Sequence, residues 1–123
     1  MKISEYFRTA KGTGILATAD AKGVVDMAVY AKPHVIDDEN IAFITAEKLT
    51  HKNLQSNPHA AYMFIEEEEK FKGVRLFLKK TKEEKESAKI DEIRRKEYPE
   101  LKGKEELVYF HVEKTLPLIG AGK

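Results

Sequence analysis

The polar residues at positions 50–53 are the part of this sequence in which residue types and spacing best suit a chemical task. They follow an apolar, strand-like run at residues 41–45 and open a short helix-like run at residues 50–56. Thr50 suits an N-cap, because its hydroxyl can accept a hydrogen bond from an amide of the first turn. Free amides and the helix dipole favour an anion at a helix start, and Lys52 would add a full charge. The segment therefore predicts a phosphate site.

The same segment also fits a plainer interpretation, in which Thr50 caps an ordinary helix and Lys52 is a surface lysine. Short motifs of this kind often occur by chance. A second strand-like run at residues 27–30 offers a further surface. If it lies beside residues 44–53, backbone groups and Tyr30 would border a flat aromatic ligand while Lys52 holds its phosphate. An apolar slot with one charged anchor is typical of cofactor sites.

Other chemical patterns receive no support from the sequence. Cysteine is absent, which excludes disulfides, thiolate catalysis and iron–sulfur clusters. The histidines do not form a ligand pair on any one predicted element; they are His34, His51, His59 and His111. The acidic run at residues 66–69 fits a solvated turn, because successive side chains of a strand alternate sides. We therefore expect no metal site, and we identify no general acid or base.

Composition and charge indicate one soluble domain spanning residues 1–123. Charged residues make up 35% of the chain, yet the formal net charge is only +1. Such a balance differs from the clustered basic excess of a nucleic-acid binder. No apolar run approaches the roughly 20 residues that cross a bilayer, and the first residues lack the apolar segment of a secretory signal. We expect a cytoplasmic protein with neither nucleic acid nor membrane as a partner.

The spacing of apolar and turn residues predicts a mainly β protein. Helices are expected at residues 3–11, 50–56 and 81–97, the last as a solvated helix with charge pairs. Strands are expected at residues 14–19, 24–32, 41–45, 60–65, 71–78 and 107–112, with a further strand piece at residues 34–36 beyond a bend at Pro33. About six strands without regular βαβ alternation suggest an antiparallel sheet closed into a small barrel, with helices outside.

Three segments occur in an order that resembles a known family. Residues 14–20 form a strand and turn, residues 43–54 join a strand to the polar helix start, and residues 57–61 lead through Asn57 and Pro58 into the next strand. In this order they resemble the FMN-binding split-barrel family related to pyridoxamine 5′-phosphate oxidase. The resemblance implies a six-stranded antiparallel split β-barrel with flanking helices.

The resemblance also implies roles for particular residues. Lys52 would bind the FMN phosphate, and the supporting phosphate contacts would be Thr50, His51 and Asn53. The flavin ring or ribityl chain would be lined by Ala28, Val29 and Tyr30, and the ring would be faced by Thr45 and Ala46. Many relatives have arginine where this chain has His51, and polar residues where it has Ala28 and Val29. At the latter two positions only backbone groups could bind the cofactor.

Family membership would imply a homodimer with the flavin at the interface and a function in oxidoreduction or electron transfer. Two alternatives stay open. The same fold could serve as a non-enzymatic binding module that holds haem or a deazaflavin, or it could be a cofactor-free regulatory dimer. The sequence does not identify a substrate, an electron donor or an acceptor.

Overall fold

The computed structural model describes residues 2–45, 48–85 and 106–120. These residues form two helices and a seven-stranded sheet. The helices are α1 (Ile3–Thr9) and α2 (Lys48–Ser56). The strands are β1 (Gly12–Ala19), β2 (Val25–Tyr30), β3 (His34–Val35), β4 (Asn40–Thr45), β5 (His59–Glu66), β6 (Gly73–Lys85) and β7 (Glu106–Pro117).

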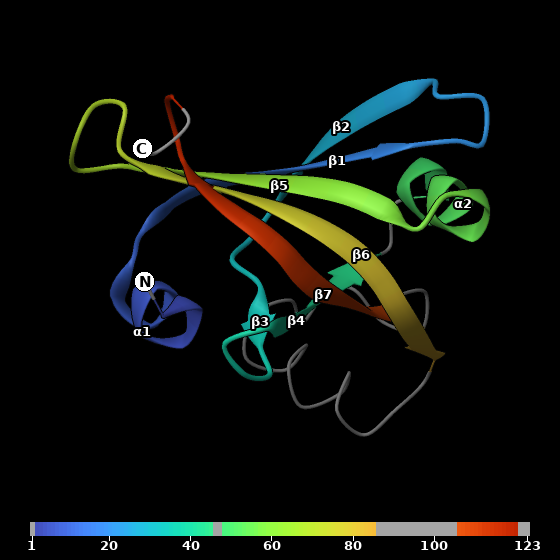
Figure 1. Ribbon diagram of the computed structural model, residues 1–123, viewed down its shortest axis with the longest axis horizontal. Coiled ribbons are helices and arrows are strands. Elements are labelled where there is room, and N and C mark those ends of the chain that lie inside the picture. Colours follow the sequence, from blue (N-terminus) through green and yellow to red (C-terminus); the bar gives the residue numbers. More distant parts are fainter. Residues whose placement is uncertain (1, 46–47, 86–105, 121–123) are drawn as a thin grey trace.

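The strands follow the order β2-β1-β5-β6-β7-β4-β3, and every neighbouring pair is antiparallel. The two end strands, β2 and β3, are not paired with each other within the described residues, so the sheet forms a curled half-barrel. The long strands β6 and β7 cross the middle of the molecule (Figure 1). The β1–β2 hairpin lies on one side of them and the short β3–β4 pair on the other.

The curl depends on the long β6–β7 pair. Its register shifts between Phe77 and Leu78 and again between Lys80 and Lys82. An irregularity of this kind bends a strand and increases its twist. Beyond the bends β6 no longer pairs with β5, whereas the first half of β7 pairs with β4. The bent pair therefore joins the two halves of the barrel.

Strand β1 shows how the sequence places side chains inside this curl. Its burial alternates, with Gly14, Leu16 and Thr18 facing inward, as expected for a strand with one buried face. A Cβ atom at Gly14 would lie 2.5 Å from the carbonyl oxygen of Tyr30 and would overlap the Tyr62 side chain. Glycine is therefore required for β1 to pack against these two tyrosines.

Aromatic side chains fill the core and α1 closes one end of it. The ring centroids of Phe43 and Tyr62 are 4.8 Å apart, and Phe7 packs edge-to-face on Phe64 with centroids 5.4 Å apart. Ile3 and Phe7 lie one turn apart on α1 and are both buried. The helix is thus held by one apolar face, as its sequence spacing predicts.

The predicted mainly β split barrel is confirmed, with a difference in strand count. The expectation was six strands, and the structure has seven because His34–Val35 pairs with β4 as a strand of its own. The first helix ends at Thr9 rather than at residue 11, and α2 begins at Lys48 rather than at Thr50. These shifts are small, but the second one matters for the site.

The largest error concerns the helix expected at residues 81–97. Residues 81–85 instead continue β6, which runs from Gly73 to Lys85, and the rest of that expected helix lies outside the described residues. The predicted last strand is also too short, because β7 continues to Pro117. Cross-strand pairing of β6 with β7 outweighs the local charge pattern that favoured a helix.

Candidate functional site

Thr50 does not cap α2. The helix begins two residues earlier, so Thr50 lies within its first turn. Its side chain is fully buried, and its Oγ1 atom has no hydrogen-bond partner among the described residues. The predicted N-cap is therefore wrong, because Thr50 is the third residue of the helix rather than the residue before it. A phosphate contact from Thr50 stays a prediction and would require that hydroxyl to turn outward.

The next three residues of α2 face three different surroundings, since successive residues of a helix are turned by about 100°. His51 is half-buried, Lys52 is exposed and Asn53 is buried. The side-chain amide of Asn53 donates to Thr18 Oγ1 over 3.0 Å, which ties α2 to β1. The structure therefore separates the three residues, and Lys52 is the one that a solvent-borne anion can reach directly.

Lys52 is well placed for that contact. Helix α2 packs beside β1 and β2, at the opposite side of the view from α1 (Figure 1). Within the described ranges no hydrogen bond or ion pair involves the Lys52 ammonium group. Helical side chains lean toward the N-terminal end, where the first amides lack intrahelical partners. Binding of one anion by Lys52 and those amides together stays a prediction.

Tyr30 and Thr45 meet, although they come from β2 and β4, which are not neighbours in the sheet. Their hydroxyl groups share a hydrogen bond, and both residues are buried. The Tyr30 ring also packs edge-to-face on Phe43, with centroids 5.8 Å apart. The condition that these two segments lie side by side therefore holds at this pair.

The other residues expected to line a flavin are distributed differently. Ala28 is half-buried and packs against the core, whereas Val29 points outward and is 77% exposed. This follows from the alternation of side chains along β2. Ala46 lies outside the described residues. The side chains of Ala28 and Val29 therefore lie on opposite faces of β2, and cofactor contacts from their backbone groups stay a prediction.

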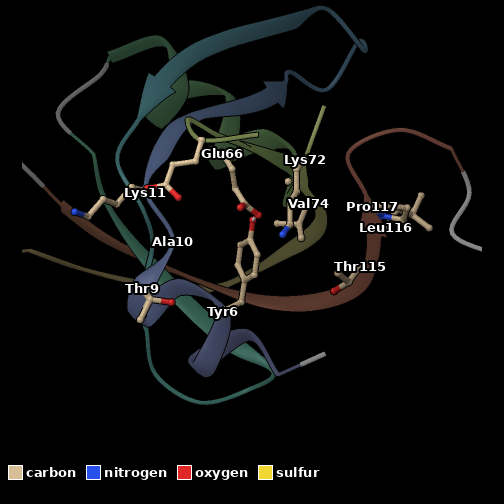
Figure 2. A pocket seen from close by; sticks show the side chains of 12 residues that line it. Tyr6, Thr9, Ala10, Lys11, Glu66, Lys72, Val74, Thr115, Leu116 and Pro117 are labelled. Atoms are coloured by element: carbon tan, nitrogen blue, oxygen red, sulfur yellow. Dashed lines mark hydrogen bonds between the residues drawn. The ribbon is translucent and has the colours of Figure 1, made fainter. Parts of the chain in front are cut away.

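A separate cavity of about 830 Å³ lies at the α1 end of the barrel (Figure 2). Its lining includes Tyr6, Ala10, Glu66, Lys72, Val74 and Leu116. The Tyr6 hydroxyl donates to the Glu66 carboxylate over 2.5 Å. Burial, followed by this hydrogen bond and the carboxylate charge, raises the pKa of the Tyr6 phenol well above its ordinary value. None of the residues predicted to bind a cofactor lines this cavity.

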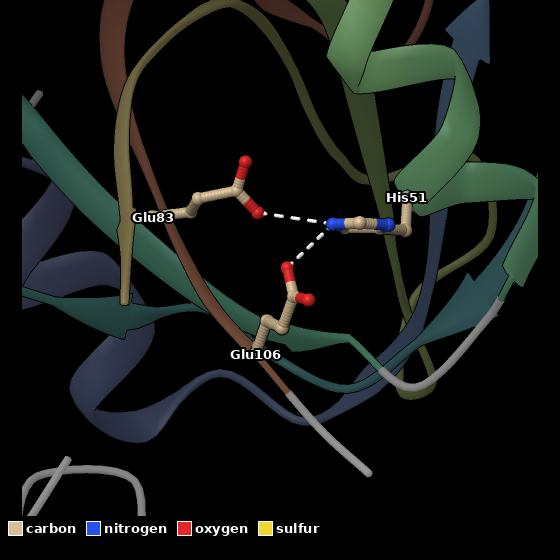
Figure 3. A group of neighbouring side chains, drawn as sticks. All are labelled: His51, Glu83 and Glu106. Carbon is tan, nitrogen blue, oxygen red and sulfur yellow. Dashed lines mark hydrogen bonds and ion pairs between the residues drawn. The ribbon is translucent and has the colours of Figure 1, made fainter. Parts of the chain in front are cut away.

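A cluster that the sequence did not reveal joins α2 to the far parts of β6 and β7 (Figure 3). His51 Nε2 lies 3.1 Å from Glu83 Oε2 and 2.6 Å from Glu106 Oε2. A hydrogen bond with Glu106 lowers the pKa of Glu83, whereas burial raises the pKa of Glu106. The two carboxyl groups thus behave as a coupled pair. No sequence pattern indicated this cluster, because Glu83 falls in the wrongly predicted helix.

The curled antiparallel sheet, with a small helix before the first strand and another between β4 and β5, defines the split-barrel class of fold. The sequence matches the family described as pyridoxamine 5′-phosphate oxidase over residues 3–115, which is nearly its whole length. The chain therefore belongs to the pyridoxamine 5′-phosphate oxidase family. No curated protein sequence matches it.

Solved structures with the same fold have diverse descriptions. An FMN-binding protein from Syntrophomonas wolfei superimposes with a TM-score of 0.80 at 21% identity, covering 97% of this chain and 85% of its own. HutZ, the haem storage protein of Vibrio cholerae, gives a TM-score of 0.66 at 20% identity, with coverage of 98% and 96%. An F420 reductase gives 0.65 at 16% identity, with coverage of 85% and 88%. At such identities the likeness establishes the fold alone.

The described helices are also informative about membranes. Neither α1 nor α2 has the length and apolar character needed to traverse a bilayer.

Proposed function

We propose that this chain is an FMN-binding flavoprotein in which Lys52 binds the phosphate of the cofactor. The observation that carries the proposal is an exposed lysine on α2 that has no hydrogen bond or ion pair within the described residues. It lies about one turn after the first residue of the helix, and the first amides of a helix lack intrahelical partners. Membership of the pyridoxamine 5′-phosphate oxidase family supports it. An FMN-binding protein of the same fold supports it as well.

The residues present fit such a cofactor in part. Lys52 would hold the phosphate, and the first amides of α2 would supply further donors. Asn53 would act indirectly, by holding α2 on β1 through Thr18. His51 would join the phosphate contacts only if its ring left Glu83 and Glu106. When bound, FMN would supply electron or hydride transfer, and the protein would position it.

A second copy of the chain would complete the site. The edge strand β2 exposes three apolar side chains on one face, Val25 at 76%, Met27 at 70% and Val29 at 77%. Their β1 partners on the same face are Ala19, Ala17 and Ile15, which extend the apolar surface. Apolar surfaces of this kind mark interaction sites. Helix α2 packs beside β2 on the other face of the hairpin, which Thr18 lines, so a homodimer formed here would contact the site from the β2 side.

Sedimentation velocity tests the dimer. The wild-type chain should sediment with twice its mass of 14.0 kDa at micromolar concentration. Val29→Asp should shift it toward the monomer, because the carboxylate would be buried without a partner. Ile119→Asp is the matched control, since Ile119 is 62% exposed and lies beyond β7. A monomeric wild-type protein, or equal behaviour of both variants, would contradict the proposed interface.

Absorbance and titration test the cofactor. Purified protein should show a flavin spectrum or acquire one on addition of FMN. Lys52→Ala should weaken FMN binding by about 1.5–3 kcal/mol, the range for a hydrogen bond to a charged group. Lys79→Ala removes the same charge from an exposed position on β6 and should leave the affinity unchanged. Equal affinities of wild type and Lys52→Ala would remove Lys52 from the site.

Haem is the second candidate ligand, because HutZ, described as a haem storage protein, shares the fold. A deazaflavin is a third, given the F420 reductase neighbour. Titration with each compound distinguishes them, since haem gives a Soret band and a deazaflavin lacks the flavin spectrum. A cofactor-free regulatory dimer would show no spectral change and no thermal shift with any of them.

A further inference from the structure

The cluster of His51, Glu83 and Glu106 brings one imidazole nitrogen and two carboxylates to one point from three elements. His51 is on α2, Glu83 near the end of β6 and Glu106 at the start of β7. Their ligand atoms all lie within 4.8 Å of one another. Figure 3 shows the three side chains pointing toward one another. Imidazole nitrogen and carboxylate oxygen are the common ligands of divalent first-row metals in proteins.

The contacts of the two carboxylates divide them into an outer and an inner oxygen. Lys80 Nζ and the Gln55 amide each donate to Glu83 Oε1 over 2.9 Å. Lys85 Nζ lies 3.3 Å from Glu106 Oε1. Both Oε2 atoms instead face His51. The neighbouring lysines therefore neutralise the outer oxygens and leave the inner pair to a single imidazole nitrogen.

That nitrogen cannot satisfy both inner oxygens. Nε2 carries at most one proton, so it can donate to one carboxylate only. Among the described residues Glu106 Oε2 is buried without a hydrogen-bond partner, although it lies 2.6 Å from Nε2. The Gln55 side-chain nitrogen is also 3.1 Å from Nε2, where it would donate to an unprotonated nitrogen. Three electron-pair donors thus converge at one point.

A metal ion could accept an electron pair from all three atoms at once. We propose that His51, Glu83 and Glu106 bind a divalent transition metal ion such as Zn²⁺ or Mn²⁺ through Nε2 and the two Oε2 atoms. Metal–ligand bonds of about 2.0–2.2 Å place neighbouring ligand atoms roughly 3.0–3.5 Å apart. The 3.1 Å contact already fits, and the 2.6 Å contact would open by about half an ångström or more.

The site is partly exposed to solvent. A bound ion would connect segments that are distant in the sequence. The side chains of His51, Glu83 and Glu106 are 34%, 22% and 13% exposed, so water can reach the ion and complete its coordination. The ion would fasten α2 to β6 and β7. It would also hold the His51 ring away from a phosphate at Lys52. The metal site uses neither Lys52 nor the first amides of α2, so it does not depend on the proposed flavin site.

Isothermal titration calorimetry of tag-free, EDTA-treated protein with Zn²⁺ and with Mn²⁺ tests the proposal. Wild type should bind one equivalent of at least one of these ions, and its Tm should rise with the concentration of that ion. Glu83→Gln and His51→Ala should each weaken metal binding more than tenfold. Loss of a residue that only supports a metal ligand already weakens binding by about tenfold or more, and these residues would be the ligands themselves. Neither readout requires FMN, so failure here leaves the flavin proposal intact.

Glu84→Gln provides the matched control, because Glu84 neighbours Glu83 on β6 but pairs with Lys82. This variant should bind the metal as wild type does. Urea unfolding without metal establishes that each variant is folded before its titration is interpreted. Absence of binding at millimolar ion would overturn the proposal, and so would equal affinity of wild type and a folded Glu83→Gln variant. The cluster would then be a network held by shared protons alone.

Discussion

The hydrogen bond between Asn53 and Thr18 is a buried polar attachment of α2 to β1, and its strength can be measured. The two residues are 4% and 3% exposed, and the donor and acceptor are 3.0 Å apart. Asn53→Ala would leave the Thr18 hydroxyl buried without this partner, which costs about 1–3 kcal/mol. Alanine is a better helix former than asparagine by up to about 0.7 kcal/mol, which offsets part of that loss.

A double-mutant cycle separates these effects. Thr18→Val keeps the shape of the side chain and should itself cost about 1–3 kcal/mol, because the Asn53 amide then loses its acceptor. In the double variant neither group is left unpaired, so the combined cost should fall below the sum of the single costs by about 1 kcal/mol or more. The propensity gain cancels in the cycle, which makes the coupling energy the quantity to measure.

Urea unfolding of the four proteins is the assay, with the m-value checked for constancy. In thermal unfolding the Asn53→Ala loss corresponds to a Tm decrease of about 3–6 °C per kcal/mol for a domain of this size. Lys52→Ala, one residue away but exposed, should change stability by less than about 0.5 kcal/mol. A coupling energy near zero between Asn53 and Thr18 would refute the claim that their hydrogen bond anchors α2.

Two further predictions concern pH. Ser4 donates to Asp38 from its amide and its hydroxyl, and these hydrogen bonds lower the Asp38 pKa. Their contribution to folding stability is complete above the ordinary pKa of about 3.9 and is lost as pH falls through the lowered value. Ser4→Ala should therefore raise the Asp38 pKa in an NMR titration, and an unchanged pKa would contradict the assignment. Tyr6 has a raised pKa, so its contribution to stability is complete below about pH 10 and is lost as pH rises through the raised value. Tyr6→Phe should remove a late-titrating phenol from the ultraviolet titration, and loss of a phenol that titrates near pH 10 would contradict the bond to Glu66.

The sequence predicted those parts of the fold that depend on local alternation. The β1–β2 hairpin follows from apolar alternation and the turn before Gly23, a residue with a φ of 87° in the structure. The second half of β6 could not be found in this way. Its residues between Lys79 and Lys85 are mostly charged, and only pairing with the distant β7 makes them a strand.

The candidate site shows the same division between local and distant information. The exposed Lys52 on a helix after β4 follows from local sequence, and the structure bears out that placement. The buried position of Thr50 does not, because it depends on where α2 begins and on what covers it. The meeting of His51 with Glu83 and Glu106 depends on the curl of the whole sheet, which no spacing in the sequence encodes.

The most direct test of the central proposal compares FMN with riboflavin, which lacks the phosphate, in calorimetric titrations of wild type and Lys52→Ala. The account predicts that wild type binds FMN more tightly than riboflavin. In Lys52→Ala the ratio of the two affinities should fall at least tenfold, which corresponds to about 1.4 kcal/mol. Riboflavin affinity should be the same for both proteins. An FMN preference that survives in Lys52→Ala, or no FMN binding by wild type, would contradict the account.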